Sequence, residues 1–437
     1  MPSYTPLRRL GLLERFQVTR HFLGHGTNVV LSAKYTAEDG APLTQERLFP
    51  ALRTLIETHA LLSVRLEGNE ASSNVAFIRL PSVDLSRIVE FSPECNLKDT
   101  LEKQLSTNFV DTQGDVPLWR VQVLGGWTVL AVFHHATADG LSAATFHHGL
   151  LKALRDPRSQ DSSPSVSVPD LPVPPSIDSV TDIGPSFRKL LSAVGTHLLP
   201  SSWTARGSTW TANDVPVMVP YLRVNVRLIT LPASNMQKLS TLCHAHNATI
   251  TSALWVLQTC ALSRVLVDTK YKYLSTNVAI SLRRIIGVRD TEVICHYASD
   301  FFVTAPVDTM FSWDRARRFA AELQAEKTDA RYIVGLLRLV GNLKKFMASE
   351  LGKKRMIGIQ ISNLGRFNAL EEGNWRIEDI FFGQADVVAG AGLSINVVGD
   401  PSGTLNITFT WGETSLESEF VERFIKSFQD EFYEILV

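Results

Sequence analysis

One short segment, residues 134–140 with the sequence His-His-Ala-Thr-Ala-Asp-Gly, holds the strongest candidates for chemistry in this chain. The ordinary pKa of a histidine side chain is about 6.5, so a neutral imidazole can accept a proton from a substrate at working pH. Asp139 follows His135 by four residues, and Gly140 comes directly after it. Glycine permits a close approach or a backbone conformation that other residues resist. The segment therefore predicts a site in which one histidine is held at a fixed angle in a cleft.

The neighbouring His134 and the distant His296 are weaker candidates. Successive side chains of a strand point to opposite faces, so His134 and His135 do not both readily face one cleft. A second histidine-to-aspartate spacing of the same kind runs from His296 to Asp300. The residues after Asp300 continue as a strand, so we expect this second copy not to be a functional site.

Three kinds of histidine chemistry can be compared at segment 134–140. A metal site is not expected, since no third ligand follows at a suitable spacing. A serine hydrolase is not expected, because the chain lacks the Gly-x-Ser-x-Gly turn that presents a nucleophilic serine. The remaining interpretation is a general base that takes a proton from an alcohol or amine attacking an activated acyl group. Asp139 suits a structural ion pair that shapes the turn better than it suits a proton relay.

The surrounding elements predict how this segment is held. The apolar run 127–133 is typical of a buried strand, and the apolar spacing of 141–154 indicates a helix, so His135 lies at a strand-to-helix turn. Helices are also predicted at 43–59, 233–245, 250–266 (with Thr249 as its N-cap) and 416–436. Strands are predicted at 62–66, 75–80, 119–124, 222–231, 272–281, 356–362, 393–398 and 405–410. This pattern predicts an α/β fold with mixed sheets in two lobes and a cleft between the lobes.

The length of the chain also favours two lobes. A chain of 437 residues exceeds what one hydrophobic core usually organises. A stretch rich in proline and serine, residues 156–185, is typical of a linker. We therefore expect an N-terminal lobe at 1–155, which carries the histidine segment, and a C-terminal lobe at 186–437.

Charge and composition narrow the partners and the compartment. The net charge is −1 and the sequence pI is about 6.8, which argues against nucleic acid or an anionic membrane as a partner. The chain has no signal-peptide core and no apolar run of the roughly 18 residues that a membrane span requires. The four cysteines lie far apart without a Cys-x-x-Cys pair. We expect a cytoplasmic, monomeric protein.

Six segments together resemble one enzyme superfamily, the HxxxD acyltransferases. These include chloramphenicol acetyltransferase, plant acyltransferases and the condensation domains of peptide synthetases. Within this group, the chain is most similar to fungal alcohol acetyltransferase-like proteins. The segments that carry the resemblance are 8–16, 48–66, 117–120, 134–140, 247–254 and 362–365.

The resemblance implies a fold and an activity. The fold would be two chloramphenicol-acetyltransferase-like lobes with mixed sheets, flanking helices and an active-site tunnel between them. His135 would deprotonate a hydroxyl or amine of a small acceptor, which then attacks the acyl group of acetyl-CoA or another acyl-CoA. Asp139 would pair with an arginine of the second lobe, for which the setting of Arg283 fits best.

The resemblance places further residues less specifically. Ser362 and Asn363 are candidates for the donor that stabilises the oxyanion, although a structural turn with Gly365 explains them as well. A basic cluster with Lys344, Lys345, Lys353 and Lys354 is a candidate for coenzyme A phosphates, although a solvated helix face explains it as well. Plant members carry Asp-Phe-Gly-Trp-Gly late in the chain, where residues 380–384 here differ, so a plant-type donor channel is not implied.

The acceptor and two alternative functions stay open. A hydrophobic or secondary-metabolite acceptor would suit a group of apolar residues that would equally suit a core: Phe381, Phe382, Val387, Val388, Leu393 and Ile395. The first alternative function is a condensation or ester-forming domain that takes its acyl group from a carrier protein. The second is a non-catalytic binding protein on the same fold, against which the intact His135, Asp139 and Gly140 argue.

Overall fold

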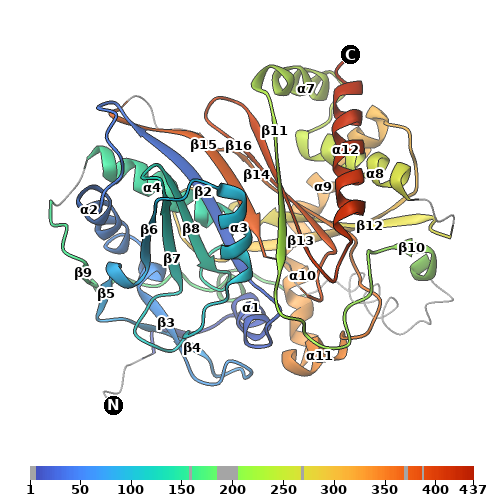
Figure 1. Cartoon of the computed structure of the whole chain (residues 1–437). Coiled ribbons are helices and arrows are strands. Elements are labelled where there is room, and N and C mark those ends of the chain that lie inside the picture. Colours follow the sequence, from blue (N-terminus) through green and yellow to red (C-terminus); the bar gives the residue numbers. More distant parts are fainter. Residues whose placement is uncertain (1–5, 157–159, 185–204, 267–269, 369–372, 386–387) are drawn as a thin grey trace.

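Two mixed β-sheets form the centre of the protein, and helices cover them (Figure 1). The computed structural model describes residues 6–156, 160–184, 205–266, 270–368, 373–385 and 388–437. Among these residues, no helix combines the length and the apolar character needed to cross a membrane.

The first sheet carries the histidine segment at the end of its central strand. It has the order β15-β2-β8-β7-β6. Its strands are β2 (Asn28–Ala37), β6 (Val89–Ser92), β7 (Trp119–Leu124), β8 (Thr128–His134) and β15 (Trp375–Gln384). Strand β6 is parallel to β7, and the other pairs are antiparallel.

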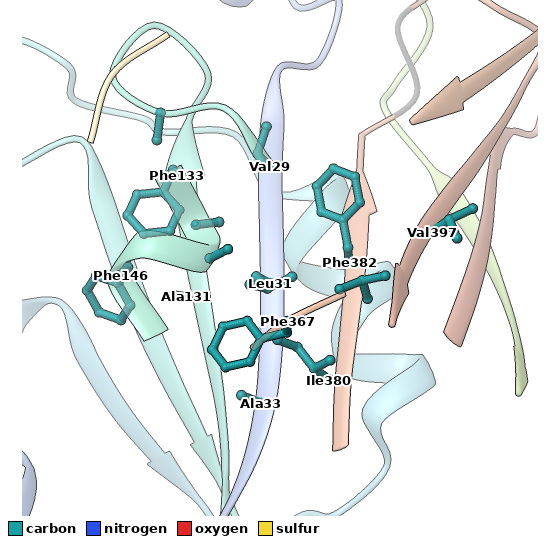
Figure 2. Close-up of a cluster of buried hydrophobic side chains, with 14 of the residues drawn as sticks. Val29, Leu31, Ala33, Ala131, Phe133, Phe146, Phe367, Ile380, Phe382 and Val397 are labelled. Atoms are coloured by element: carbon teal, nitrogen blue, oxygen red, sulfur yellow. The ribbon is translucent and has the colours of Figure 1, made fainter. Parts of the chain in front are cut away.

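Successive side chains of β2 and β8 point to opposite faces of this sheet, and each face packs into a different hydrophobic cluster. One face, with Leu31 and Phe133, belongs to the main core beside α4 (Gly140–Arg155) and α2 (Gln45–Ile56). The other face, with Val30 and Val132, belongs to a separate cluster with α3 (Leu97–Ser106). Figure 2 shows part of the main core, where side chains of β2, β8, α4 and β15 meet. Because both faces are covered, β8 is buried along almost its whole length and fixes the position of the turn that follows.

The second sheet lies in the C-terminal half. It has the order β10-β12-β14-β16-β17-β11, with β13 paired to β12. Its strands are β10 (Thr209–Trp210), β11 (Val224–Leu231), β12 (Tyr273–Ser281), β13 (Ala298–Pro306), β14 (Ile359–Arg366), β16 (Leu393–Gly399) and β17 (Leu405–Gly412). The helices α7 (Ala233–Ala245), α8 (Ile250–Val265), α9 (Trp313–Asp329) and α12 (Ser418–Glu434) follow or precede these strands, and α8 packs against both α9 and α12.

Two features join the halves of the sequence. Strand β15 belongs to the C-terminal half, yet it pairs antiparallel with β2 and extends the first sheet. The proline-rich stretch is also attached: β9 (Ser165–Ser167) pairs with β5 (Ser82–Asp84), and a turn of helix, α5 (Ile177–Val180), follows. Residues 157–159 and 185–204 lie outside the described part of the chain, so the structure does not place the expected linker boundary at 185. The described part of the stretch therefore contacts the N-terminal half through this pairing, and its role as a linker stays a prediction.

Several short elements complete the fold. The helix predicted at 43–59 ends at Ile56 and continues as the 3-10 helix η1 (Ala60–Ser63), and Thr249 accepts a hydrogen bond from the backbone of Ser252 as the expected N-cap. The remaining strands are β1 (Arg8–Arg9), β3 (Val64–Glu67) and β4 (Ala76–Arg79), which form a small sheet. The remaining helices are α1 (Leu12–Phe22), α10 (Arg331–Leu336), α11 (Leu343–Ser349), η2 (Leu85–Arg87), η4 (Ala205–Ser208), η5 (Arg283–Ile286) and η6 (Leu337–Val340).

Candidate active site

A cavity of about 240 Å³ lies between the two halves of the chain, and His135 is on its wall. The wall comes from helix α1, the β8–α4 turn, and strands β13, β14 and β15. It includes Phe16, Arg20, His135, Gly140, His296, Asp300, Gln360, Ser362, Phe382 and Gln384. A larger and more open hollow of about 480 Å³ lies over Arg47 and Trp375, and its lining residues include no histidine. The smaller cavity is therefore the candidate active site.

The turn after β8 orients the His135 ring by a hydrogen bond. Strand β8 ends at His134, and α4 begins at Gly140. The Nδ1 atom of His135 lies 2.8 Å from the carbonyl oxygen of Ala138. A carbonyl oxygen only accepts, so Nδ1 carries the proton in this contact. The remaining ring nitrogen, Nε2, then has a lone pair with which to accept a proton.

The surroundings of His135 keep its ring neutral. Burial lowers the pKa of His135 to about 4, against a smaller opposing effect of the hydrogen bond to Ala138. Removing a charged imidazolium from water is costly, which is why burial favours the neutral form. The ring is therefore in the form that can act as a base at neutral pH.

His134 lies on the other side of the strand. It is fully buried and is absent from the cavity wall. Its ring packs against those of His21 (centroids 4.6 Å apart) and Phe109 (5.8 Å), and its Nδ1 accepts a hydrogen bond from the backbone of Ala136. These contacts are those of a core residue, in agreement with the alternation of side chains along β8.

Asp139 holds the turn to the second half of the chain. Its Oδ2 accepts from Nη1 of Arg283 at 2.6 Å, and its Oδ1 accepts from Nη2 at 2.9 Å. It also caps α4 by accepting from the backbone and hydroxyl of Ser142, and Oδ2 accepts from the backbone of Tyr297. The carboxylate thus has a partner on every side, and the structure gives it no hydrogen bond to His135.

The charge of Asp139 is stabilised in spite of its burial. Burial would raise the pKa of Asp139, but the nearby charge of Arg283 and its hydrogen bonds, with the one from Ser142, hold that pKa well below its usual range. The Arg283 side chain has no solvent exposure, and its own pKa is raised because the charge and hydrogen bonds of Asp139 outweigh the effect of burial. The pair is ionised at neutral pH and holds the turn that carries His135.

Gly140, the first residue of α4, lies where the side chains of Leu364 and Phe382 approach the backbone closely. A Cβ atom at this position would lie 2.5 Å from a methyl carbon of Leu364 and 2.9 Å from Cζ of Phe382. Both distances are shorter than real carbon contacts, so the absence of a side chain lets strands β14 and β15 close against the turn. Of the two reasons considered for this glycine, the structure supports the close approach.

His296 was missed by sequence reasoning. Its ring lies against the His135 ring, with centroids 4.4 Å apart and planes inclined by 31°. It also lies on the cavity wall, and burial, with a smaller effect of His135, lowers its pKa well below the ordinary value. The second histidine-to-aspartate spacing, which was expected not to be a functional site, lies on the wall of the same cavity, because His296 and Asp300 line it together with His135. Asp300 is on strand β13, as expected, but strand structure did not exclude the site.

The two candidates for an oxyanion donor differ in position. Ser362 lies on the cavity wall, in β14. Asn363 is absent from that wall; its amide donates to the hydroxyl of Thr251 at 3.0 Å and its oxygen accepts from the backbone of Gly365. Asn363 therefore has the contacts of a turn residue, and Gly365 has the positive φ of 76° that such a turn requires.

The lysines of the basic cluster do not line this cavity. Lys353 pairs with Glu350, and Lys354 donates to the backbone of Thr209. Lys344 lies over the ring of Phe22, and Lys345 contributes its backbone to the N-terminus of α11.

The apolar residues considered for an acceptor pocket are mostly elsewhere. Phe382 lies on the cavity wall, whereas Phe381, Val388, Leu393 and Ile395 are buried and absent from it. Val387 lies outside the described residues. The wall that His135 faces carries many polar groups, including Gln360 and Gln384.

Comparison with known proteins decides the family. A model of the family "alcohol acetyltransferase" matches residues 9–432. The chain belongs to the alcohol acetyltransferase family. It is 24% identical to an Aspergillus fumigatus protein named probable alcohol acetyltransferase crmB, over 94% of this chain and 96% of that one. A Fusarium pseudograminearum protein named probable alcohol acetyltransferase FCK4 is 25% identical, over 81% of this chain and 79% of its own length.

Solved structures show the fold of this alcohol acetyltransferase family member. The trichothecene 15-O-acetyltransferase of Fusarium sporotrichioides superposes with a TM-score of 0.72 at 12% identity, covering 97% of this chain and 94% of that one. The condensation domain of the monacolin K polyketide synthase MokA superposes with a TM-score of 0.66 at 13% identity, covering 99% and 97%. The expected α/β fold of the chloramphenicol acetyltransferase type is confirmed, and the chain is an acyltransferase.

Proposed function

We propose that this acyltransferase moves an acetyl group from acetyl-CoA to a hydroxyl group of a small acceptor, with His135 as the general base. The observation that carries the proposal is the hydrogen bond from Nδ1 of His135 to the carbonyl of Ala138 at 2.8 Å. It leaves Nε2 as the nitrogen that can take a proton, on a neutral ring at the wall of the cavity. General-base catalysis requires that combination of position and protonation state.

The reaction would proceed in two steps. Nε2 of His135 takes the proton of the acceptor hydroxyl while its oxygen forms a bond to the thioester carbonyl carbon. The resulting tetrahedral oxyanion collapses, the bond from carbon to sulfur breaks, and the proton on His135 passes to the departing thiolate. The products are an acetate ester and free coenzyme A.

Two other groups have supporting roles in this proposal. Ser362 is the candidate donor to the oxyanion, because it lies on the same wall as His135, whereas Asn363 is engaged with Thr251. Asp139 and Arg283 position the turn and do not take part in proton transfer, since the carboxylate is fully engaged away from the ring. The four lysines stay a prediction for the phosphates of coenzyme A.

A second candidate for the acyl donor is a thioester on a carrier protein, which the similarity to condensation domains favours. The deciding experiment measures thiol release from acetyl-CoA with a panel of alcohols and amines. A parallel reaction supplies the acetyl group on a phosphopantetheinylated carrier protein. The proposal expects release from acetyl-CoA with alcohols. Transfer from the loaded carrier alone would contradict the donor, and turnover of amines without alcohols would contradict the acceptor.

A further inference from the structure

Strand β13 presents alternate side chains to the active-site cavity. Ala298, Asp300 and Phe302 all line it, and Ser299 also contacts it, although its hydroxyl donates to the backbone carbonyl of Ala330. Phe301 lies on the opposite face of the strand, where its ring contacts that of Phe319 in α9. Because the period of a strand is two, Asp300 points from the sheet into the same cavity as His135, on a wall that also holds His296.

The Asp300 carboxyl is only half engaged by the protein. Its Oδ1 accepts a hydrogen bond from Nδ2 of Asn277 at 2.8 Å, from the neighbouring strand β12. No described residue donates a hydrogen bond to Oδ2. This oxygen is also not one of the buried side-chain atoms that lack a partner, so it is accessible from the cavity. Gln360 stands opposite Asn277 in the parallel pairing of β12 with β14 and also lines the cavity. The open oxygen therefore belongs to a polar floor that three strands build.

The second oxygen of Asp300 is open to the cavity, so its hydrogen-bond partner must come from water or from a bound molecule. Burial raises the pKa of Asp300 to about 6, against the opposing hydrogen bond from Asn277 and the nearby charge of Arg20. Buried polar groups in proteins nearly always have partners. An alanine or serine would fill the same position on β13 without this cost. The missing partner is most simply a hydrogen-bond donor of the bound acceptor.

We propose that Asp300 recognises the acceptor by accepting a hydrogen bond from a second hydroxyl group, distant from the one that is acetylated. Arg20 lines the same cavity, so a neutral hydroxyl fits this place better than a second cation. His296, whose ring lies against that of His135, comes just before β13, and Asp300 follows it by four residues, so the two backbones are at most roughly 14 Å apart. The second hydroxyl would therefore lie near the far end of the acceptor. This inference rests on the proposed acetyl transfer by His135.

Matched alcohols can test the inference without knowledge of the natural acceptor. The acceptors are straight-chain diols with a hydroxyl at each end, from butanediol to decanediol, beside the primary alcohols of the same lengths. Thiol release from acetyl-CoA gives kcat/KM for each. The enzymes are the wild type, Asp300→Ala, the near-isosteric Asp300→Asn, His135→Ala, and Glu322→Gln as a matched change of an exposed acid on α9. Thermal unfolding of each variant checks that it is folded.

The expected result is a preference for diols that depends on Asp300. The wild type and Glu322→Gln should favour the longer diols over the matching alcohols by about ten- to a hundredfold in kcat/KM, since a charged hydrogen bond would be lost with the alcohols. Asp300→Ala should lose that preference because its kcat/KM falls for the diols and stays unchanged for the alcohols. Asp300→Asn should retain part of the preference. Equal kcat/KM for the two classes in the wild type, or an equal loss in both classes on Asp300→Ala, would overturn the inference. The proposed function is judged separately, because it requires that His135→Ala lose turnover of both classes.

Discussion

Asp139 and Arg283 form a two-point ion pair between positions 144 residues apart in the chain, with oxygen-to-nitrogen distances of 2.6 and 2.9 Å. The aspartate caps α4 directly after the histidine turn, and the arginine begins η5 directly after strand β12. Both side chains are buried. The pair therefore fastens the turn that carries His135 to the second sheet, and the rigidity of the site depends on it.

Removing one charge of this pair should damage both folding and activity. Asp139→Asn leaves the Arg283 guanidinium buried without its counter-charge, and breaking such a pair costs about 3–5 kcal/mol in the free energy of unfolding. Urea unfolding measures the loss, and thiol release measures the accompanying fall in kcat. The double variant Asp139→Asn with Arg283→Met is the control, since it leaves no uncompensated buried charge while the asparagine oxygen can still cap α4. A fully active and equally stable Asp139→Asn variant would contradict the positioning role.

The same pair makes a defined contribution to acid sensitivity. The folded pKa of Asp139 lies well below its ordinary value, because Arg283 and the hydrogen bonds outweigh burial. Its contribution to stability is therefore complete above the ordinary pKa, about 3.8, and is lost as the pH falls below it toward the folded value. The free energies of unfolding of wild type and Asp139→Asn should differ constantly from neutral pH down to about pH 5 and begin to converge below about pH 4. A constant difference at all pH values would contradict the assignment.

The pH dependence of activity should follow the low pKa of His135. Protonation removes the lone pair that acts as base, so kcat/KM is retained above the pKa of the free enzyme and falls below it. Burial sets that pKa at about 4. The profile of kcat/KM should therefore stay level through pH 6.5 and fall only on approach to about pH 4. An apparent pKa near 6.5 would show instead that the ring is open to water before substrate binds.

Gly140 and Gly149 make a matched pair of glycines in helix α4. Gly140→Ala places a Cβ 2.5 Å from Leu364, and overpacking of this kind costs about 1–3 kcal/mol. At Gly149 a Cβ would meet Leu55 at an ordinary 3.5 Å, and alanine there should stabilise the helix by up to about 1 kcal/mol. Thermal unfolding should therefore shift in opposite directions. A Gly140→Ala variant as stable as Gly149→Ala would show that the strands move aside freely.

His296 should act by positioning His135. Because the two rings lie against each other with centroids 4.4 Å apart, His296→Phe keeps a ring against His135, whereas His296→Ala leaves a space into which His135 can turn. We expect kcat/KM to fall by about tenfold or more for alanine and to be largely restored for phenylalanine, since small misplacements of a catalytic group are costly. If phenylalanine is as harmful as alanine, a ring nitrogen of His296 takes part directly.

Local patterns in the sequence predicted the elements but not all of their partners. Helix 233–245 and strand 119–124 are found with the predicted bounds, because their apolar spacing depends on near neighbours. The pairing of β15 with β2 was not predicted, since Ser32 and Phe381 meet across 349 residues and no local signal specifies that contact. The pairing of β9 with β5 within the proline-rich stretch was not predicted for the same reason, because it is set by tertiary structure.

In the candidate site, too, local sequence patterns indicated some residues, whereas others come together only through long-range pairing. His135 and Asp139 stand out because a strand, a turn and a helix follow each other in sequence, and the choice of Arg283 came from the family resemblance. Asp300 reaches the same cavity through the pairing of β13 with β12, and His296 reaches it from the segment just before β13, which a spacing of residues does not specify. A usable signal was present for the strand nonetheless: positions 298, 300 and 302 share one face of it.

The most direct test of the account compares His135→Ala with His244→Ala, a substitution of an exposed histidine on α7. Thiol release from acetyl-CoA is measured with an accepted alcohol under saturating conditions. The account predicts that His135→Ala lowers kcat by at least about a hundredfold, through loss of the general base, while His244→Ala behaves as wild type. Equal thiol release by wild type and a folded His135→Ala protein would contradict it.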